Sequence, residues 1–192
     1  MKISIVGIGN GGCNILDDIQ KDEYYADAKF VYCDYEADDL SRHGKDHDCK
    51  FLLNIEHLND FSFADENADL TIIASALGGR ATSTFSAQIT EACKKRSKMV
   101  LGAITLPLSI EGQHRIDCAK QTLDTLKPLY DALLIQDNTA IPQNLGIGDM
   151  NAPLCSGLKI LCTALNEPNV NELNDLSETD VKFIASNGLV IE

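Results

Sequence analysis

Two patterns of apolar positions alternate along the chain. Residues 2–6 (KISIV) and 30–33 (FVYC) are short apolar runs typical of strands, whereas residues 11–21 between them repeat apolar positions at helical spacing. The first run leads into a glycine turn at residues 7–12, and the second ends at Asp34. These segments together predict a strand–helix–strand unit.

The rest of the chain repeats this order. Further strands are predicted at residues 50–53, 70–74, 99–104, 132–135 and 188–191, and helices at residues 84–95, 111–126, 151–165 and within 180–192. Pro153 falls in the first turn of its helix, where proline is tolerated. The alternation predicts an α/β, Rossmann-like fold of three layers with a mainly parallel sheet, in a single domain over residues 1–192.

Composition narrows the class of protein. The chain has 192 residues, 44% of them hydrophobic, and it contains no apolar run long enough to span a bilayer. Its start shows no signal peptide, so we expect a cytoplasmic protein without membrane insertion. A net charge of −13 argues against nucleic-acid binding, which depends on Lys and Arg. The short basic cluster at residues 94–96 is expected to end a helix.

Cysteine and histidine positions do not predict a metal site. None of the seven cysteines forms a Cys-x-x-Cys pair, so we expect reduced thiols, mostly in the core: Cys13, Cys33, Cys49, Cys93, Cys118, Cys155 and Cys162. His43 and His47 have helical spacing with Cys49 nearby, but the segment is polar and charged. Solvated loop histidines are the favoured interpretation.

In a parallel sheet, ligands bind beyond the carboxyl ends of the strands, so the residues that follow each strand are informative. The turn GIGNGG after the first strand is typical of a phosphate cradle at a helix start, and the alternative is a turn that only packs the helix closely on the strand. Asp34 lies about twenty residues further on, where a dinucleotide-binding unit places its ribose-binding carboxylate. NAD is therefore one candidate ligand.

Two later strand ends carry further polar groups. Gly78 and Gly79 precede a run of hydroxyl side chains at residues 82–84, which suits either a second phosphate group or capping of a helix near Thr84. Glu111 and Arg115 lie one helical turn apart, a spacing that suits either a ribose and a phosphate or a surface salt bridge.

Taken in order, these segments resemble the nucleotide-binding domain of the FtsZ and tubulin family, and FtsZ more closely. The matching stretches are GIGNGGCN, YCDYEADDL, IIASALGGRATSTFSAQI, TLPLSIEGQHR, LDTLKPLYDALLIQDN and NDLSETDVKFIASNGLVIE, which span nearly the whole chain. The resemblance implies the N-terminal domain fold of that family without its second domain, and it makes NAD a weaker alternative.

The resemblance also implies a site for GTP or GDP with Mg²⁺. Its nucleotide-binding residues are then Gly9, Asn10, Gly11, Gly12, Cys13, Asn14, Gly78, Gly79, Thr82, Ser83, Thr84, Glu111, Arg115 and Asp137. Asp137 stands at the position that reads guanine. Asp175 and Asp180 occupy the acidic loop that acts in hydrolysis across a filament contact.

Several residues depart from the family pattern. The signature GGGTGTG reads GGRATST here, which places the side chain of Arg80 where glycine is usual. Ser177 replaces the middle acid of the last loop, and no carboxylate stands at residues 151–153, where the family places an Asp against the base. Hydrolysis by positioned groups is expected to slow by two to three orders of magnitude, roughly, when one such acid is lost.

The sequence thus predicts a divergent FtsZ-like guanine-nucleotide-binding domain with weak or absent GTP binding and hydrolysis, linked to cell division or filament assembly. Its partners are guanine nucleotide and either itself or an FtsZ filament. One alternative is a non-enzymatic FtsZ-like regulator that docks on such a filament. A second alternative is an NAD-type Rossmann protein.

Overall fold

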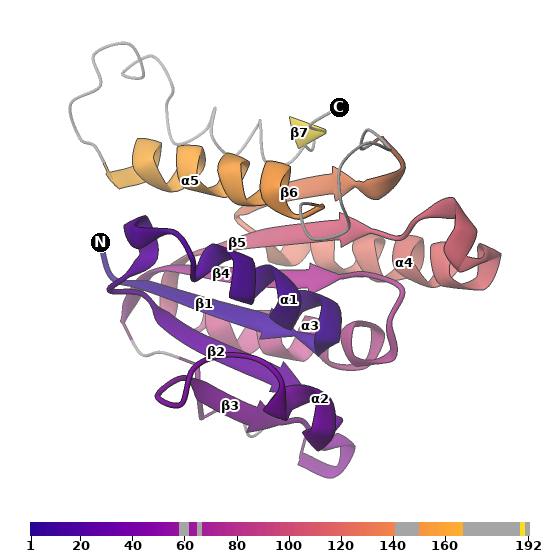
Figure 1. The fold of residues 1–192 in the computed structure, drawn as a ribbon, viewed down its shortest axis with the longest axis horizontal. Helices are drawn as coiled ribbons and strands as arrows, with labels where there is room; N and C mark the ends of the chain where they lie inside the picture. Colours follow the sequence, from indigo (N-terminus) through magenta and orange to yellow (C-terminus); the bar gives the residue numbers. More distant parts are fainter. Residues whose placement is uncertain (58–61, 65–66, 141–149, 167–188, 191–192) are drawn as a thin grey trace.

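The computed structural model describes residues 1–57, 62–64, 67–140, 150–166 and 189–190. Within these ranges the chain forms one parallel sheet of seven strands with helices on both faces (Figure 1). The predicted α/β, Rossmann-like class is confirmed.

The elements alternate along the chain as the apolar pattern predicts. The strands are β1 (Ile3–Ile8), β2 (Lys29–Asp34), β3 (Cys49–Leu52), β4 (Ala68–Ala76), β5 (Ser97–Leu106), β6 (Ala132–Asp137) and β7 (Leu189–Val190). The α-helices are α1 (Gly9–Ile19), α2 (Ala37–Ser41), α3 (Arg80–Lys94), α4 (Gln113–Leu126) and α5 (Ala152–Asn166). Short 3₁₀ helices are η1 (Glu23–Tyr25), η2 (Ile55–His57), η3 (Ser109–Glu111), η4 (Lys127–Leu129) and η5 (Asn138–Ala140).

The strand order fixes where a ligand site can form. The sheet runs β3-β2-β1-β4-β5-β6-β7, and every neighbouring pair is parallel. From β1 the chain first builds outward through β2 and β3, and it then returns to the other side of β1 with β4. Between β1 and β4 the winding direction reverses, and such a switch point leaves a crevice at the carboxyl ends of the strands.

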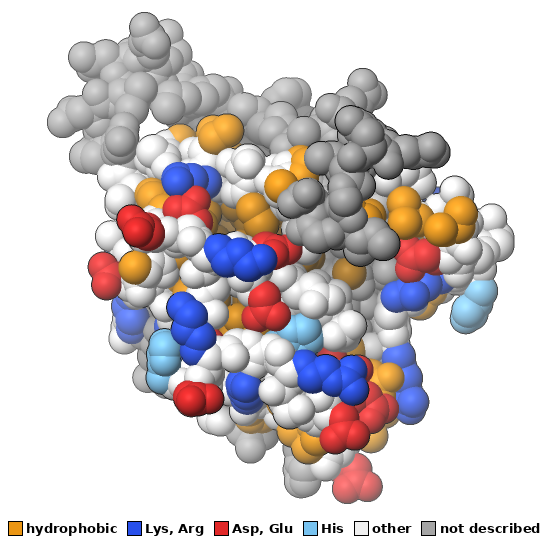
Figure 2. Space-filling model, viewed as in Figure 1, with side chains coloured by type: hydrophobic (Ala, Val, Ile, Leu, Met, Phe, Trp, Pro, Cys, Tyr) orange, Lys and Arg blue, Asp and Glu red, His pale blue; other side chains and the backbone are white. Residues whose placement is uncertain are grey.

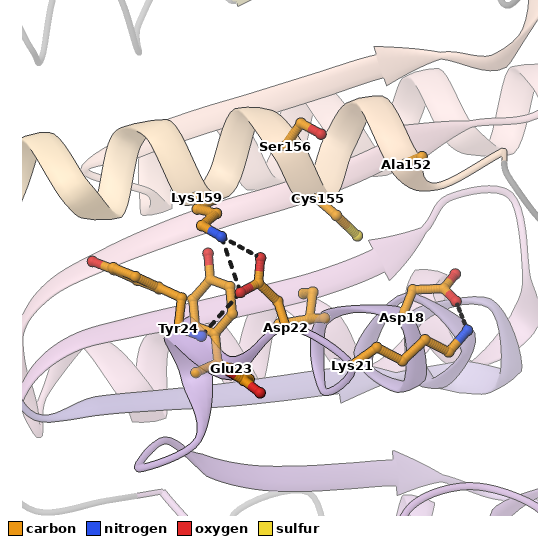
Figure 3. A pocket seen from close by; sticks show the side chains of 11 residues that line it. Asp18, Lys21, Asp22, Glu23, Tyr24, Ala152, Cys155, Ser156 and Lys159 are labelled. Atoms are coloured by element: carbon orange, nitrogen blue, oxygen red, sulfur yellow. Dashed lines mark hydrogen bonds and ion pairs between the residues drawn. The ribbon is translucent and has the colours of Figure 1, made fainter.

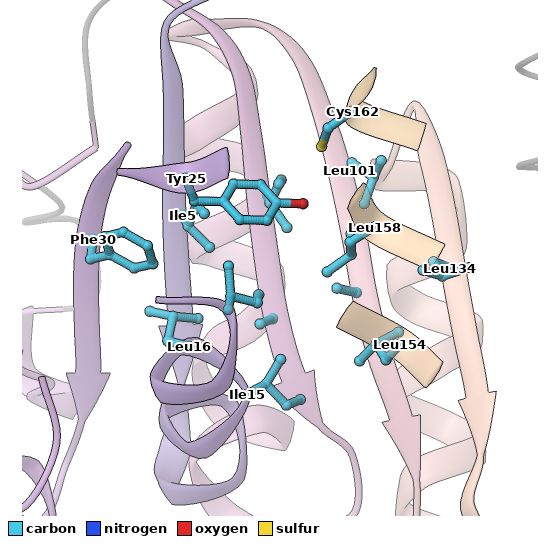
Figure 4. Packing of buried hydrophobic residues seen from close by; sticks show 14 of the residues in the cluster. Ile5, Ile15, Leu16, Tyr25, Phe30, Leu101, Leu134, Leu154, Leu158 and Cys162 are labelled. Atoms are coloured by element: carbon cyan, nitrogen blue, oxygen red, sulfur yellow. The ribbon is translucent and has the colours of Figure 1, made fainter. Parts of the chain in front are cut away.

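Each face of the sheet carries its own core. Ile5 of β1 and Ile72 of β4 are fully buried on the face covered by α1 and α5. This face lies in front of the sheet in Figure 1, and Figure 4 shows Ile5 there in close-up. The chain neighbours Val6 and Ile73 are fully buried on the opposite face, against α3 and α4. Burial of both faces explains why these strands are continuous apolar runs.

Helix α5 packs one apolar stripe against the sheet. Leu154, Leu158 and Cys162 are fully buried against the sheet, whereas Leu161 and Leu165 are only partly buried. The start of the helix is held from strand β6, because the backbone N–H of Leu154 donates to Oε1 of the buried Gln136 at 3.0 Å. Pro153 is the second residue of the helix, as predicted.

Three helix starts differ from the sequence prediction. Helix α1 begins at Gly9 rather than residue 11, so the expected glycine turn is the first turn of the helix. Helix α3 begins at Arg80 rather than Thr84, because Gly78 makes the turn at φ +88°. The segment predicted as one helix from Glu111 is divided by Gly112, at φ +96°, into η3 and α4.

Strand β7 confirms the centre of the last predicted strand and pairs with β6. The helical segment expected between residues 180 and 187 lies outside the described residues. Among the helices that the structure describes, none is both long enough and apolar enough to cross a membrane.

The packing of α5 can be tested with two substitutions on one helix. Leu158→Ala removes a fully buried side chain and is expected to lower the free energy of unfolding by about 2–5 kcal/mol. Ile160→Ala is the matched control, since that side chain is 70% exposed and its loss should change the value by less than about 0.5 kcal/mol. Urea denaturation followed by circular dichroism measures the free energy of unfolding of both variants. Equal losses in the two variants would contradict the placement of α5.

Candidate functional site

Two helix N-termini meet the carboxyl edge of the sheet at the switch point. Helix α1 follows β1 directly, and α3 follows β4 after Gly78 and Gly79. Neither helix has a side-chain hydrogen bond capping its N-terminus, and neither has an acidic residue in its first turn. Free backbone N–H groups and the positive end of the helix dipole make this edge suitable for an anion.

Glycine contacts bring the two helix starts together. A Cβ atom added to Gly9 would lie 3.1 Å from Cβ of Ala81 on α3, and one added to Gly11 would lie 2.4 Å from Cβ of Ala76 at the end of β4. Gly9 itself has φ +72°, which side chains of L residues rarely adopt. The close approach of α1 to the sheet therefore requires the glycines that the sequence places there.

The hydroxyl groups expected at the second glycine turn lie inside α3. Thr82 is 2% exposed and its Oγ1 donates to the carbonyl of Gly79 at 2.9 Å, while Oγ of Ser83 donates to the carbonyl of Arg80 at 3.1 Å. The expectation that the helix starts near Thr84 and is capped there is wrong, because these hydroxyls bond to carbonyls of the preceding turn. Only Ser83 is exposed.

Cys13 and Asn14 take opposite positions on α1. The Cys13 side chain is fully buried beneath the helix, and burial raises the pKa of its thiol to about 12. It therefore stays protonated in the core and is not presented to a ligand. Asn14 is exposed on the surface of the helix.

Arg115 and Glu111 lie next to the second glycine turn. A Cβ atom added to Gly78 would lie 2.6 Å from the carbonyl oxygen of Arg115, so α4 touches this turn. Nη1 of Arg115 lies 3.0 Å from Oε2 of Glu111, and Oε1 of Glu111 accepts from the N–H of Leu108 at 2.7 Å. Both side chains are thus at the site and form the salt bridge that their spacing also suits.

Arg80 points along the edge of the sheet toward the end of β2. Its guanidinium carbon lies 5.2 Å from the centroid of the Tyr35 ring, within the range of a cation–π contact. Arg80 is exposed at the first position of α3, beside the free N–H groups of that helix. Tyr35 is a site neighbour that the sequence did not suggest, since nothing local links it to residue 80.

The Asp34 carboxylate is engaged within its own turn. The residue is 2% exposed, and Oδ1 accepts from the backbone N–H groups of Tyr35 at 2.7 Å and Glu36 at 3.3 Å. A ribose hydroxyl has little access to such a carboxylate. The geometry therefore disfavours the NAD interpretation, which depends on this residue.

The side chains at the end of β6 also form hydrogen bonds with neighbouring residues. Oδ1 of Asp137 accepts from the N–H and the hydroxyl of Thr139, at 2.9 and 2.7 Å. Oδ1 of Asn138 accepts from Nε2 of the buried Gln136 at 2.9 Å. Asn151, at the start of α5, donates from Nδ2 to Oδ2 of Asp18 at 2.8 Å.

His43 does not behave as a solvated loop residue, and that prediction is wrong. It is 5% exposed and contacts Asn10 and Asp17 of α1, at 2.8 and 2.7 Å. His47, by contrast, has a side chain that is 78% exposed. No local sequence pattern indicates the contacts of His43, because the packing of α2 brings α1 and residue 43 together.

The thiols follow the prediction of reduced cysteines. All seven are free, and Cys13, Cys33, Cys93 and Cys162 are buried. Burial raises the pKa of Cys93 to about 12 and that of Cys162 to about 11. Within the described ranges, no group of three or more His, Cys, Asp or Glu side chains is arranged to hold a metal ion.

The face drawn in Figure 2 carries no continuous basic patch among the described residues. Lys and Arg side chains are interspersed there with Asp and Glu among the described residues. Lys94 ends α3, as the basic cluster predicts, and its Nζ lies 3.1 Å from Oδ1 of Asp131.

A hollow of about 890 Å³ lies away from the carboxyl edge, between α5 and the C-terminal end of α1 with η1 (Figure 3). Nζ of Lys159 bonds both carboxylate oxygens of Asp22 across it, at 2.8 and 3.0 Å. The hydrogen bond from Lys159 lowers the pKa of Asp22. These contacts join α5 to Asp22, the residue before η1, and the charged groups that face each other across the hollow are therefore paired.

Asp175 and Asp180, the predicted residues of the hydrolytic loop, lie outside the described residues, as does Ser177. Of the other predicted positions, Asp137 ends β6, Gly78 and Gly79 form the turn between β4 and α3, and the rest lie on α1, α3, η3 and α4.

Comparison with known proteins identifies the fold. No family model matches the chain. A structure of an FtsZ dimer from Methanocaldococcus jannaschii superposes with a TM-score of 0.73 at 21% identity, covering 93% of this chain and 60% of that one. This chain has the fold of the FtsZ and tubulin N-terminal domain. The resemblance drawn from the motifs is confirmed.

Two further matches extend the FtsZ-like comparison. CetZ2 from Haloferax volcanii, solved as a GTPγS-bound protofilament, superposes with a TM-score of 0.72 at 16% identity over 92% of this chain and 62% of that one. Cell division protein FtsZ 1 of Thermococcus kodakarensis is 24% identical over 97% of this chain and 56% of its own length. The chain thus spans about half the length of that FtsZ protein.

The close approach of α1 to β4 can be tested at Gly12. Alanine is favoured over glycine in a helix by about 1 kcal/mol, but a Cβ atom at this position would lie 2.5 Å from the carbonyl oxygen of Ala74. Overpacking against backbone typically costs about 1–3 kcal/mol, so Gly12→Ala is expected to destabilise the FtsZ-like domain. Asn14→Ala, exposed on the same helix, is the control and should be neutral or slightly stabilising in thermal unfolding.

Proposed function

We propose that this chain is an FtsZ-like guanine-nucleotide-binding domain that holds the phosphates of GDP or GTP between the N-termini of α1 and α3. The observation that carries the proposal is the convergence of these two uncapped helix starts at the switch point of the sheet. CetZ2 of the same fold was solved with GTPγS bound, which supports this choice of ligand.

Electrostatics favour an anion at this edge in spite of the acidic composition. The chain has a net charge of −13, yet the first turns of α1 and α3 contain no acidic residue. Arg80 and Arg115 supply side-chain cations in the predicted site. A phosphate group there would receive backbone N–H donors, two helix dipoles and charge-assisted hydrogen bonds.

We expect weak recognition of the sugar and base. Glu111 and Arg115 must exchange their mutual salt bridge for contacts with ribose and phosphate. Asp137 and Asn138 already accept hydrogen bonds from Thr139 and Gln136, so reading guanine requires these bonds to rearrange. Such prior pairing lowers the net gain from each new hydrogen bond.

Arg80 is proposed to help binding rather than to fill the site. Its contact with Tyr35 holds the guanidinium at the edge of the sheet, beside the N-terminus of α3. A cation in this position offsets the loss of the signature glycines, because it adds a charge-assisted bond where close backbone approach is reduced.

Hydrolysis is proposed to be slow or absent, and assembly to be conditional. The acidic loop at Asp175 and Asp180 has Ser177 in place of its middle acid. Relatives of the same fold were solved as a dimer and as a protofilament, which supports self-association or docking on an FtsZ filament as a proposal for this chain. Mg²⁺ is the expected companion of the bound phosphates.

Binding is tested by isothermal titration with GDP and GTP in the presence of Mg²⁺, with ATP and NADH as competitors. Arg115→Ala is expected to weaken GDP binding about 10-fold, the lower end of the roughly 1.5–3 kcal/mol that a hydrogen bond to a charged group contributes, because Arg115 already pairs with Glu111. Lys120→Ala, exposed on the same helix, is the control and should bind as the unchanged chain does. Saturable NADH binding without GDP binding would contradict the proposal.

Turnover and assembly are tested together. With GTP and Mg²⁺, phosphate release measured by a colorimetric assay is expected to stay close to the protein-free rate. Sedimentation with and without GTP then reports whether the chain pellets alone or only with an added FtsZ. Rapid GTP turnover by the chain alone would contradict the expected loss of hydrolysis.

A further inference from the structure

His43 forms a bridge between two side chains of α1 that the proposed phosphate site does not otherwise link. Its Nδ1 lies 2.7 Å from Oδ2 of Asp17, and its Nε2 lies 2.8 Å from Oδ1 of Asn10. The other oxygen of Asp17 accepts from the backbone N–H of Gly44 at 3.0 Å, which holds the carboxylate in place. The imidazole is 5% exposed, so its partners must come from the protein.

The number of protons on the ring decides how Asn10 is oriented. A neutral imidazole has one N–H, whereas the protonated ring has two. With both nitrogens protonated, His43 donates to Asp17 and to Oδ1 of Asn10, which matches the amide orientation in the structure. With Nδ1–H donating to Asp17 and Nε2 unprotonated, the Asn10 amide must turn so that its NH₂ group donates to the ring.

We propose that His43 is a positioning residue that sets which end of the Asn10 carboxamide faces the anion site at the start of α1. In the protonated state the Asn10 NH₂ group faces outward as a donor, and the imidazolium adds a positive charge behind it. In the neutral state the carboxamide oxygen faces outward and repels an anion. Phosphate affinity is therefore expected to be higher when the ring carries both protons and to fall as a rising pH removes one of them.

The charged and titratable groups around the ring bear on whether His43 alone can account for a pH-dependent change at Asn10. Among the described residues, the titratable groups that contact or stack on the ring are Asp17 of α1 and Tyr32 of β2. Asp39 of α2, Arg42 directly after α2, and Asp48 of the loop before β3 are charged groups of the neighbouring segments. Burial and the nearby Asp17 carboxylate raise the pKa of Tyr32 well above its ordinary value, so this ring stays neutral. Asp39 is paired with Arg42 at 3.0 Å, and Asp48 accepts from Gln20 at 2.9 Å.

Asn10 is well placed to transmit the change. It is exposed in the first turn of α1, directly after Gly9 and beside the free N–H groups of the helix. The consequence for phosphate binding rests on the proposed function, whereas the orientation of Asn10 does not.

The orientation is tested by NMR on the full chain without nucleotide, labelled with ¹⁵N. Across about pH 5.5–8.5, the Asn10 side-chain amide signals are expected to shift with the same midpoint as the His43 ring nitrogens. The Asn10 signals are assigned by their loss in Asn10→Ala. In His43→Gln the pH-dependent shift of Asn10 should disappear, and in His47→Gln, an exposed neighbour, it should remain. Asn10 signals that do not follow His43 would overturn the inference.

The consequence is tested with GDP as the probe, titrated at pH 6 and pH 8. The ligand's own protonation affects every variant equally, so the comparison uses the ratio of affinities at the two pH values. This ratio is expected to be about 5- to 10-fold larger for the unchanged chain and His47→Gln than for His43→Gln, within the usual range of coupling between sites. Asn10→Ala, whose side chain is exposed, should lose the extra dependence without the folding cost of a buried substitution.

The two experiments separate the possible failures. Equal ratios in all variants would overturn the inference even if GDP binds. If GDP does not bind at all, the proposed function fails, and the NMR titration alone decides whether His43 orients Asn10.

Discussion

The close approach of helix α1 to strands β1 and β4 is the constraint on which the rest of the structure depends. Gly11 and Gly12 lie so near Ala76 and Ala74 that any side chain larger than hydrogen would collide with the end of β4. This approach seats the apolar face of α1 on the sheet core. It also places the N-terminus of the helix at the point where the sheet reverses its winding, beside the start of α3. The packing that builds the core thus builds the edge with anion-binding geometry.

That edge combines features with opposite consequences for a ligand. Free backbone N–H groups and two helix dipoles favour phosphate, and they depend only on the path of the main chain. The side chains around them are largely engaged already, Arg115 with Glu111 and Arg80 with Tyr35. The main-chain N–H groups can therefore bind a phosphate without rearrangement, whereas Arg115 and Arg80 must first leave Glu111 and Tyr35. This difference is the physical basis for expecting weak nucleotide binding in a domain of otherwise suitable shape.

Local periodicity predicts the elements well and their starts less well. The strands are recovered because both faces of the sheet are buried, which makes each strand a short apolar run such as residues 70–74. The start of α3 at Arg80 is missed because hydroxyl side chains suggested a cap at Thr84, and in the structure they bond to carbonyls within the helix. Similarly, Gly112 divides a continuous helical pattern by adopting a positive φ, which its residue type permits but does not require.

The sequence by itself determined the order of strands and helices, the glycine turns and the family-like arrangement of polar residues at the strand ends. These features depend on local spacing and on residue type. The tertiary structure alone decided which of the polar residues are already paired and that His43 is buried against Asn10 and Asp17. Such contacts join residues that are far apart in the chain, and their geometry follows from how α2 packs beside α1, which no local pattern records.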